Sequence, residues 1–331
     1  MKQPITRSLR LFVTGLSMGI ADLVPGVSGG TIAFLSGIYE ELLESIRIVS
    51  GTTLKLLLQG KMILAVQSVP FSFLIPLVGG LGLSIFSLAN LLSWLLNSYP
   101  VFVWSFFFGL VLASVFIVLK RVVSWDLPDK IAFTVATIAA YFLVGAVPIE
   151  TPTNLLFIFL SGAIAICAMI LPGISGSFIL LLLGKYQYIL AAVVGRDFLT
   201  LAVFIGGCII GLSVFARFLS WLFAHHHDIS VVVLAGIMLG SIRKIWPWKE
   251  VVATRINSHG EVVPFIENNV LPATLDESVL LAIILVIAGM VIMYTLDRLK
   301  VVKEQTEDLP NSELPLQHQK SLDSQRSSKQ Q

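Results

Sequence analysis

The sequence has very little charge. Asp, Glu, Lys and Arg make up 13% of its 331 residues, about half the share of a typical soluble domain, whereas 56% are hydrophobic. The mean hydropathy is +0.89. Apolar runs of roughly 20 residues recur along the chain, the length that a helix needs to cross a bilayer. The composition therefore excludes a soluble enzyme and indicates an all-α, polytopic membrane protein.

Cysteine and net charge are scarce as well. Cys167 and Cys208 lie inside apolar runs, which predicts buried thiols rather than a disulfide or a metal site. A net charge of +2, with basic residues scattered over loops, does not indicate nucleic-acid binding. We expect no cofactor. We also expect no cleavable signal peptide, because Asp22 and a Pro-Gly turn interrupt the first apolar stretch.

Several apolar runs predict spanning helices. They cover residues 69–97, 100–119, 131–148, 199–223, 229–242 and 279–296, which gives six spans. Two other apolar regions, 8–46 and 154–194, are interrupted by Pro-Gly turns that a continuous helix does not tolerate. We expect each region to be a helical hairpin that dips into the membrane and returns. For the second region, two full spans are an alternative.

The two Pro-Gly turns belong to an internal repeat. Residues 25–30 (PGVSGG) match residues 172–177 (PGISGS) at an offset of 147, and downstream the offset becomes 127, as for Gly80 and Gly207. Three spans separate the two hairpins, an odd number, so the second hairpin enters from the opposite face. The sequence thus predicts two inverted repeats, each with one re-entrant hairpin and three transmembrane helices.

These signals divide the chain into consecutive parts. They are a first repeat at 1–130 (hairpin 8–46, interfacial helix 47–68, spans 69–97 and 100–121), a third span at 131–148, an inverted second repeat at 149–246 (hairpin 154–194, spans 199–223 and 229–245), an outer loop with a β-hairpin at 247–277, a last span at 278–300 and a disordered cytoplasmic tail at 301–331. Lys and Arg concentrate on the side of both termini, so we expect both termini to be cytoplasmic.

The two turns predict an anion-binding site. A helix that begins inside the membrane presents unpaired backbone N–H groups and the positive end of its dipole, and small residues let an oxyanion approach closely. Two such helices that enter from opposite faces and meet near the midplane form the central site of inverted-repeat transporters. The alternative is that the small residues only allow tight helix packing.

Charged residues at membrane depth are costly and are therefore candidates for function. Asp22, just before the first turn, could carry a proton or help to hold a sodium ion; alternatively, it caps the following helix. Lys185 and Arg217 could neutralise a phosphate or could extend toward the interface. Arg243 and Lys244, close to two tryptophans, are predicted to be interfacial anchors.

Residues 18–46, MGIADLVPGVSGGTIAFLSGIYEELLESI, resemble the signature of the PopT family of bacterial polyprenyl-phosphate transporters, and the similarity runs from about residue 8 to residue 300. The resemblance implies a flippase that returns undecaprenyl phosphate, the lipid carrier of cell-wall precursors, from the outer to the inner leaflet of the bacterial cytoplasmic membrane. It also implies that the phosphate binds at both turns, through Asp22, Pro25, Gly26, Ser28, Gly29, Gly30, Thr31, Pro172, Gly173, Ser175, Gly176 and Ser177.

The second turn departs from the first at two positions. Met169 stands where the first copy has Asp22, and Ser177 where it has Gly30, so whether both turns bind phosphate equally stays open. Moving an anion inward against an inside-negative potential costs about 2.3 kcal/mol per charge per 100 mV, so we expect a coupled proton or sodium ion. The oligomeric state stays open.

Two other functions share parts of this pattern. An undecaprenyl-pyrophosphate phosphatase of the BacA type resembles the architecture, but that family places Arg in its Ser-rich turn and several acidic residues before its first turn. Here no Arg follows Ser175, and only Asp22 precedes the first turn. A carrier of small anions has all the physical features described above, and only competition between substrates separates it from a lipid flippase.

Overall fold

The computed structural model describes residues 5–307 except 25–26, 121, 123–124, 150, 257–261, 273 and 275. The first half contains α1 (Ile5–Leu23), α2 (Gly29–Leu35), α3 (Tyr39–Arg47), a π-helical turn η1 (Ile48–Thr53), α4 (Leu54–Leu58), α5 (Met62–Ser68), α6 (Phe71–Ser98), α7 (Pro100–Leu119) and α8 (Leu127–Val144). The second half contains α9 (Leu155–Ile170), α10 (Gly176–Leu182), α11 (Tyr186–Val194), α12 (Phe198–His225), α13 (His227–Ser241), a 3-10 turn η2 (Ile242–Ile245), β1 (Lys249–Ile256), β2 (Val262–Asn269) and α14 (Glu277–Glu307).

Among the described residues, five helices are long and apolar enough to cross a membrane: α6, α7, α8, α12 and α14. This confirms the prediction of an all-α, multi-pass membrane protein. The sixth predicted span corresponds to α13 and η2. α13 alone has 15 residues, about 22 Å at 1.5 Å per residue, which is shorter than a roughly 30 Å hydrocarbon core, so this span stays a prediction. Most residues of α13 are buried, and the helix packs against α8 and α7.

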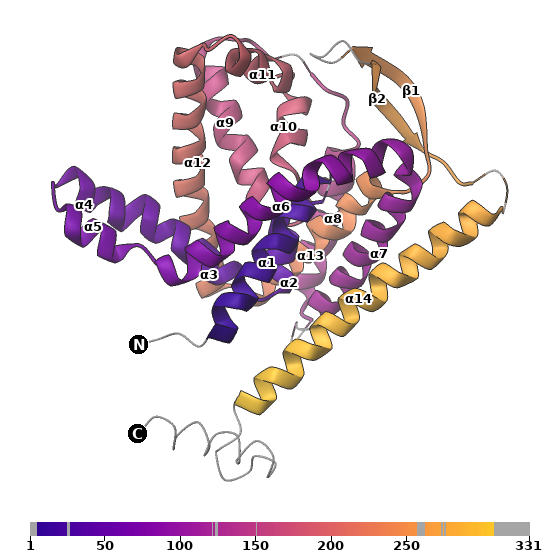
Figure 1. The fold of residues 1–331 in the computed structure, drawn as a ribbon, viewed down its shortest axis with the longest axis horizontal. Helices are drawn as coiled ribbons and strands as arrows, with labels where there is room; N and C mark the ends of the chain where they lie inside the picture. The colour runs from indigo at the N-terminus through magenta and orange to yellow at the C-terminus, as the bar shows by residue number, and fades with distance from the viewer. Residues whose placement is uncertain are drawn as a thin grey trace.

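Each Pro-Gly turn separates a long helix from a short one. In the first hairpin α1 is followed by the seven-residue α2, and in the second α9 is followed by the seven-residue α10. The next helix, α11, is bent by 105° from α10. A straight span is therefore not formed between residues 176 and 194, and the chain instead folds back above α9 in the view of Figure 1.

The two halves use the same helix pairs. α1 packs along α6, and α9 packs along α12 in the equivalent place. The repeated Gly80 and Gly207 lie at these contacts, where a Cβ atom would collide with the backbone carbonyls of Phe12 and Phe159, respectively. Glycine is needed at both positions because the helix backbones approach too closely for any side chain.

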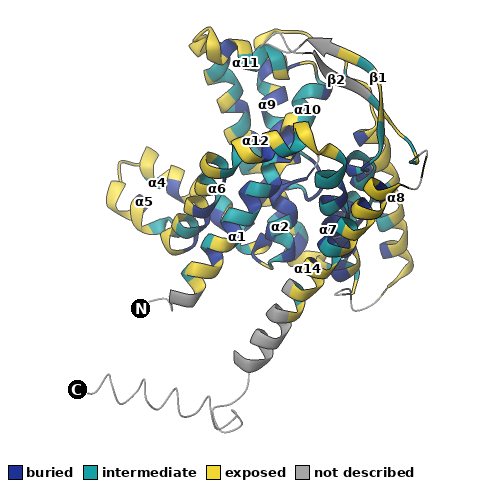
Figure 2. Cartoon of the chain, turned by 45° about the vertical axis from the view of Figure 1, so that its right-hand side comes forward, coloured by how far each residue is buried: buried dark blue, intermediate teal, exposed yellow. Residues whose placement is uncertain are grey.

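The remaining spans are exchanged between the halves. α7 of the first half packs along α14 of the second, while α13 of the second half packs along α8 of the first. The repeated Gly109 and Gly236 lie at these contacts, facing the backbone carbonyls of Val286 and Phe133. This exchange ties the halves into one helix bundle, and Figure 2 shows its most deeply buried residues around α1, α2 and α7. That the halves are inverted copies stays a prediction.

Three boundaries differ from those predicted. One interfacial helix was predicted over 47–68, but the chain forms η1, α4 and α5 there. It turns back at Gly60, whose φ is +73°, and α4 and α5 project together at the left of Figure 1. α8 begins at Leu127, before the predicted 131, because Asp126 and Asp129 form a capping box there. α14 continues to Glu307, so residues 301–307, predicted as tail, are helical. The tail from 308 onward lies outside the described residues.

The loop between η2 and α14 contains the predicted β-hairpin. β1 and β2 pair antiparallel, with Lys249 opposite Asn269 and Val251 opposite Glu267. Side chains on one face of a strand are two residues apart, so Lys249 and Glu267 are diagonal neighbours on the same face of the hairpin. The indole N–H of Trp246 donates to the carbonyl of Val270 at 2.8 Å, which ties the start and the end of the hairpin together.

Candidate functional site

In the first turn, the described polar side chains are buried, and Ser28 caps the helix that follows. Ser28, in an extended conformation, caps α2, and its Oγ accepts a hydrogen bond from the Gly30 N–H at 3.1 Å. Ser28 and Thr31 are 1% and 0% exposed, and Val24 and Val27 pack in an apolar cluster with Phe107 of α7. The predicted site residues Pro25 and Gly26 lie outside the described residues.

Asp22 acts on the same helix end. Its Oδ1 accepts a hydrogen bond from the Gly29 N–H at 2.6 Å, so a carboxylate of the chain itself lies at the positive end of α2. A Cβ atom on Gly29 would lie 2.6 Å from Asp22 Oδ2, which shows that glycine is needed for the carboxylate to come this close. Capping of the following helix, one of the two roles predicted for Asp22, is the geometry observed. Its proton or sodium role stays a prediction.

The second turn is more open. Gly173 has a φ of +89°, a conformation that favours glycine. Ser175 caps α10 only by its backbone, and its hydroxyl lies 2.7 Å from that of Ser177. Ser175 is half-buried and Ser177 is exposed. Because Met169 replaces Asp22 in this copy, no carboxylate occupies the equivalent position, and the two turns differ electrostatically.

The two turns contact each other directly. The Gly173 N–H donates a hydrogen bond to Thr31 Oγ1 at 3.0 Å. Ser28 Oγ donates to the carbonyl of Met169 at 3.2 Å, and the Tyr39 hydroxyl donates to the carbonyl of Ile170 at 3.3 Å. These contacts join residues more than 130 positions apart in the chain. The structure thus brings Ser28 and Thr31 of the first turn into contact with the second turn.

Replacing Thr31 with valine is expected to weaken the contact between the two turns and so to destabilise the protein. Valine keeps the shape of the side chain but removes the acceptor for the buried Gly173 N–H, and an unpaired buried donor costs about 1–3 kcal/mol. We expect a lower thermal unfolding midpoint of the purified protein. Thr134→Val is the matched control, because the exposed Thr134 hydroxyl only donates to the carbonyl of Lys130 in its own helix. Equal unfolding midpoints for the two variants would contradict a stabilising role for the hydrogen bond between Thr31 and Gly173.

Lys185 is not brought to the turns. It lies at the opposite end of α10 from Ser175, and its Nζ donates a hydrogen bond to the carbonyl of Thr151. The Tyr188 ring lies 6.0 Å from the same Nζ, and Thr151 Oγ1 donates to the carbonyl of Leu183 at 2.6 Å. Lys185 therefore holds the bend between α10 and α11 against the preceding loop. A phosphate-binding role at the turns receives no support from this geometry.

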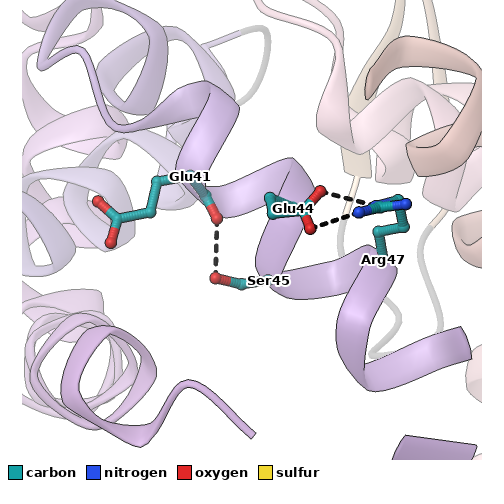
Figure 3. Close-up of polar contacts among 4 residues, drawn as sticks. All are labelled: Glu41, Glu44, Ser45 and Arg47. Carbon is teal, nitrogen blue, oxygen red and sulfur yellow. Dashed lines mark hydrogen bonds and ion pairs between the residues drawn. The ribbon is translucent and has the colours of Figure 1, made fainter. Parts of the chain in front are cut away.

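Arg217 also lies away from the turns. It is exposed on α12 and lines a cleft of about 570 Å³ together with Lys55 and Arg47, between α12 and the segment from η1 to α4. Figure 3 shows that Arg47 is already neutralised, since its guanidinium donates two hydrogen bonds to Glu44, at 2.6 and 2.7 Å. The cleft includes no residue from either turn.

Sequence reasoning missed a cluster of two lysines and one glutamate near the turns. Lys244 in η2 and Lys249 in β1 both lie near Glu267 of β2, with Nζ to Oε2 distances of 3.9 and 3.3 Å. Burial lowers the pKa of both lysines, and the Glu267 carboxylate partly offsets this effect. No sequence pattern pointed to this cluster, because Glu267 reaches the lysines only through the register of the β-hairpin.

Arg243, the neighbour of Lys244, has a different position. Its guanidinium lies 4.5 Å from the centre of the Tyr141 ring in α8 and donates a hydrogen bond to the Tyr141 carbonyl at 3.3 Å. These contacts suit the predicted anchoring role. Lys244 Nζ instead lies 5.2 Å from the ring of Phe178, which follows Ser177 in the second turn. Two adjacent basic residues with the same predicted role therefore face different surroundings.

Two broken-helix turns that meet inside a bundle of apolar spans are an arrangement found in multi-pass membrane transporters. The chain belongs to the VCA0040-like family, described as undecaprenyl phosphate translocase-like, which it matches over residues 18–263. This confirms the resemblance inferred from residues 18–46 and the prediction of a transporter rather than an enzyme.

Two relatives support this assignment. The chain is 43% identical over 296 residues to the polyprenyl-phosphate transporter of Vibrio cholerae serotype O1, covering 88% of this chain and 96% of that protein. It is 32% identical over 257 residues to the polyprenyl-phosphate transporter of Staphylococcus aureus, covering 70% and 84%. No solved structure matches the chain.

Proposed function

We propose that this protein transports undecaprenyl phosphate and returns it from the outer to the inner leaflet of the bacterial cytoplasmic membrane. Family membership and the two relatives support the class of substrate. The observation that carries the mechanism is the contact between the turns, where Gly173 N–H bonds to Thr31 Oγ1 and Ser28 Oγ bonds to the Met169 carbonyl. Both termini are cytoplasmic in this proposal, on the basis of the Lys and Arg distribution.

The phosphate is proposed to bind where the two turns meet. Serine hydroxyls, glycine N–H groups and the positive ends of α2 and α10 supply hydrogen-bond donors without a large side chain in the way. The accessible Ser175 and Ser177 of the second turn suit the first contact, because their hydroxyls bond only to each other among the described contacts. The buried first turn becomes available only when the Thr31 and Ser28 contacts break.

The proposed mechanism is alternating access. The hydrogen bonds between the turns hold one closed state, and a substrate phosphate that accepts bonds from the same groups can replace them as the halves move. Asp22, which already lies at the end of α2, is the proposed carrier of a coupled proton or partner of a sodium ion. A cation that moves with the lipid offsets the cost of carrying negative charge against the membrane potential.

Transport by the purified protein in proteoliposomes tests this function. Undecaprenyl phosphate is added to one leaflet, and the amount that becomes accessible in the other is followed over time. We expect transfer only in vesicles that contain the protein, with undecaprenol left untransported. Release of phosphate from undecaprenyl pyrophosphate would favour the phosphatase instead. Full competition by inorganic phosphate at matched concentration would favour a small-anion carrier.

A further inference from the structure

Lys244, Lys249 and Glu267 form a partly enclosed cluster with one excess positive charge, here called the lysine cluster. Their side chains are 27%, 9% and 26% exposed. Both ammonium groups lie near the same carboxylate oxygen, and the longer distance, 3.9 Å, belongs to Lys244. One carboxylate cannot neutralise two lysines. Removing ammonium groups from water is costly unless they are paired, so this arrangement favours a further anion.

The lysine cluster lies beside both turns. Ser241, directly before η2, lies close to Gly173, since a Cβ atom there would lie 2.5 Å from Ser241 Oγ. Ile245 of η2 packs in the apolar cluster that contains Val24 and Val27 of the first turn. η2, which carries Lys244, therefore lies close to residues of both turns.

The direction of the lysine side chains supports a role at the turns. Lys244 Nζ lies 5.2 Å from the ring of Phe178, the residue after Ser177. Lys249 Nζ lies 4.4 Å from the Trp104 ring in α7. In Figure 1, β1 and β2 lie above the upper end of α7. Aromatic faces attract ammonium groups, so the two rings help to hold both charges in place without neutralising them.

The chemistry of the cluster selects a doubly charged oxyanion. A phosphate monoester carries a charge of about −1.5 to −2 at neutral pH and three strong acceptor oxygens. Two ammonium groups placed around one carboxylate oxygen could bind such a group with Glu267 displaced. An apolar tail would extend away from the ionic cluster, since the surfaces of the spanning helices are apolar.

We propose that Lys244 and Lys249 form a receiving site for the phosphate headgroup of a prenyl phosphate, and that Glu267 is an internal anion that the headgroup displaces. The site lies on the side of the β-hairpin, so the headgroup reaches it before Ser177 and the turns. This inference rests on the proposed function, because it assumes that a prenyl phosphate is the substrate.

Binding of farnesyl phosphate to the full-length protein in phosphatidylcholine nanodiscs tests the proposal, with farnesol as the uncharged probe. Lys244→Gln and Lys249→Gln should each weaken binding of farnesyl phosphate about tenfold, as expected for the loss of one charge-assisted hydrogen bond. Glu267→Gln should strengthen binding severalfold, because it removes the competing anion. Farnesol binding should stay unchanged. The exposed Lys61 supplies the control Lys61→Gln, which should bind like the unmodified protein.

The sign of the Glu267→Gln effect separates binding from folding. A purely structural cluster would lose stability in all three variants, and farnesyl phosphate binding would fall in each. Lys244→Arg and Lys249→Arg keep the charge and should keep binding within about threefold. Weaker or unchanged binding by Glu267→Gln overturns the proposal, as does normal binding by both lysine-to-glutamine variants.

Two further measurements distinguish the possible failures. If the unmodified protein neither binds nor transports a prenyl phosphate, the proposed function fails, and the receiving site fails with it. If the unmodified protein transports undecaprenyl phosphate but the lysine variants bind and transport equally well, only the receiving site fails. Inorganic phosphate should displace farnesyl phosphate only weakly, and equal potency would reassign the site to free phosphate.

Discussion

Replacing Asp22 with asparagine is expected to abolish the dependence of transport on an ion gradient. Asparagine keeps an oxygen that can accept the hydrogen bond from the Gly29 N–H, but it can neither exchange a proton nor supply a charge to sodium. The coupling free energy for one charge at 100 mV is about 2.3 kcal/mol, which corresponds to a factor of about fifty in accumulation. Initial rates in proteoliposomes with imposed proton or sodium gradients measure this effect.

The control for this experiment is another aspartate at a helix start. Asp197 caps α12 through hydrogen bonds from the Thr200 N–H and hydroxyl, and its side chain has no contact with either turn among those described. Asp197→Asn should keep the response to both gradients. If Asp22→Asn responds to the gradients like the unmodified protein, Asp22 is only a helix cap, and the coupling group must be sought elsewhere.

Replacing Gly30 with alanine is expected to reduce transport at least tenfold. A Cβ atom on Gly30 would lie 2.5 Å from the backbone carbonyl oxygen of Ile170, so the two turns must move apart to accommodate it. Backbone atoms cannot rotate away as a side chain can, and forced overpacking of this kind costs about 1–3 kcal/mol. The separation breaks the contacts of Ser28 and Thr31 with the second turn, which the proposed closed state requires.

Gly206→Ala is the matched control, because a Cβ atom at Gly206 in α12 would have no atom within 4 Å. Its transport rate and thermal unfolding midpoint should equal those of the unmodified protein. Both variants should be compared at equal amounts of folded protein in the vesicles, so that a loss of transport is not a loss of protein. Normal transport by Gly30→Ala would show that close contact between the turns is dispensable.

The turns illustrate what the sequence could predict. The repeated Pro-Gly-Ser pattern indicated helix breaks in both halves, and the odd number of spans between them predicted that the breaks would face each other. Proline and glycine disrupt a helix locally, wherever the helix lies, so these breaks could be predicted without tertiary structure. The contact between Thr31 and Gly173 agrees with the prediction that the turns meet. The sequence did not indicate which residues would form this contact.

The charged residues were predicted less well. Lys185 and Arg217 were candidates only because they are charged and lie in apolar regions, and the structure shows Lys185 bonded to Thr151 and Arg217 in a separate cleft. Lys244, interpreted as an anchor, lies near Glu267 beside the second turn. A long side chain can reach partners in several directions, and its position in the sequence does not say which one it meets.

The sequence by itself determined that this protein is a bundle of apolar helices with two broken ones, because hydropathy and helix disruption depend on residues close together in the chain. Only the tertiary structure decided that α7 packs with α14 and α8 with α13, since these contacts join helices that are far apart in the sequence. It alone also decided which cations lie beside the turns. Those positions depend on contacts between residues such as Lys244 and Glu267, which come together only when the β-hairpin folds over the bundle.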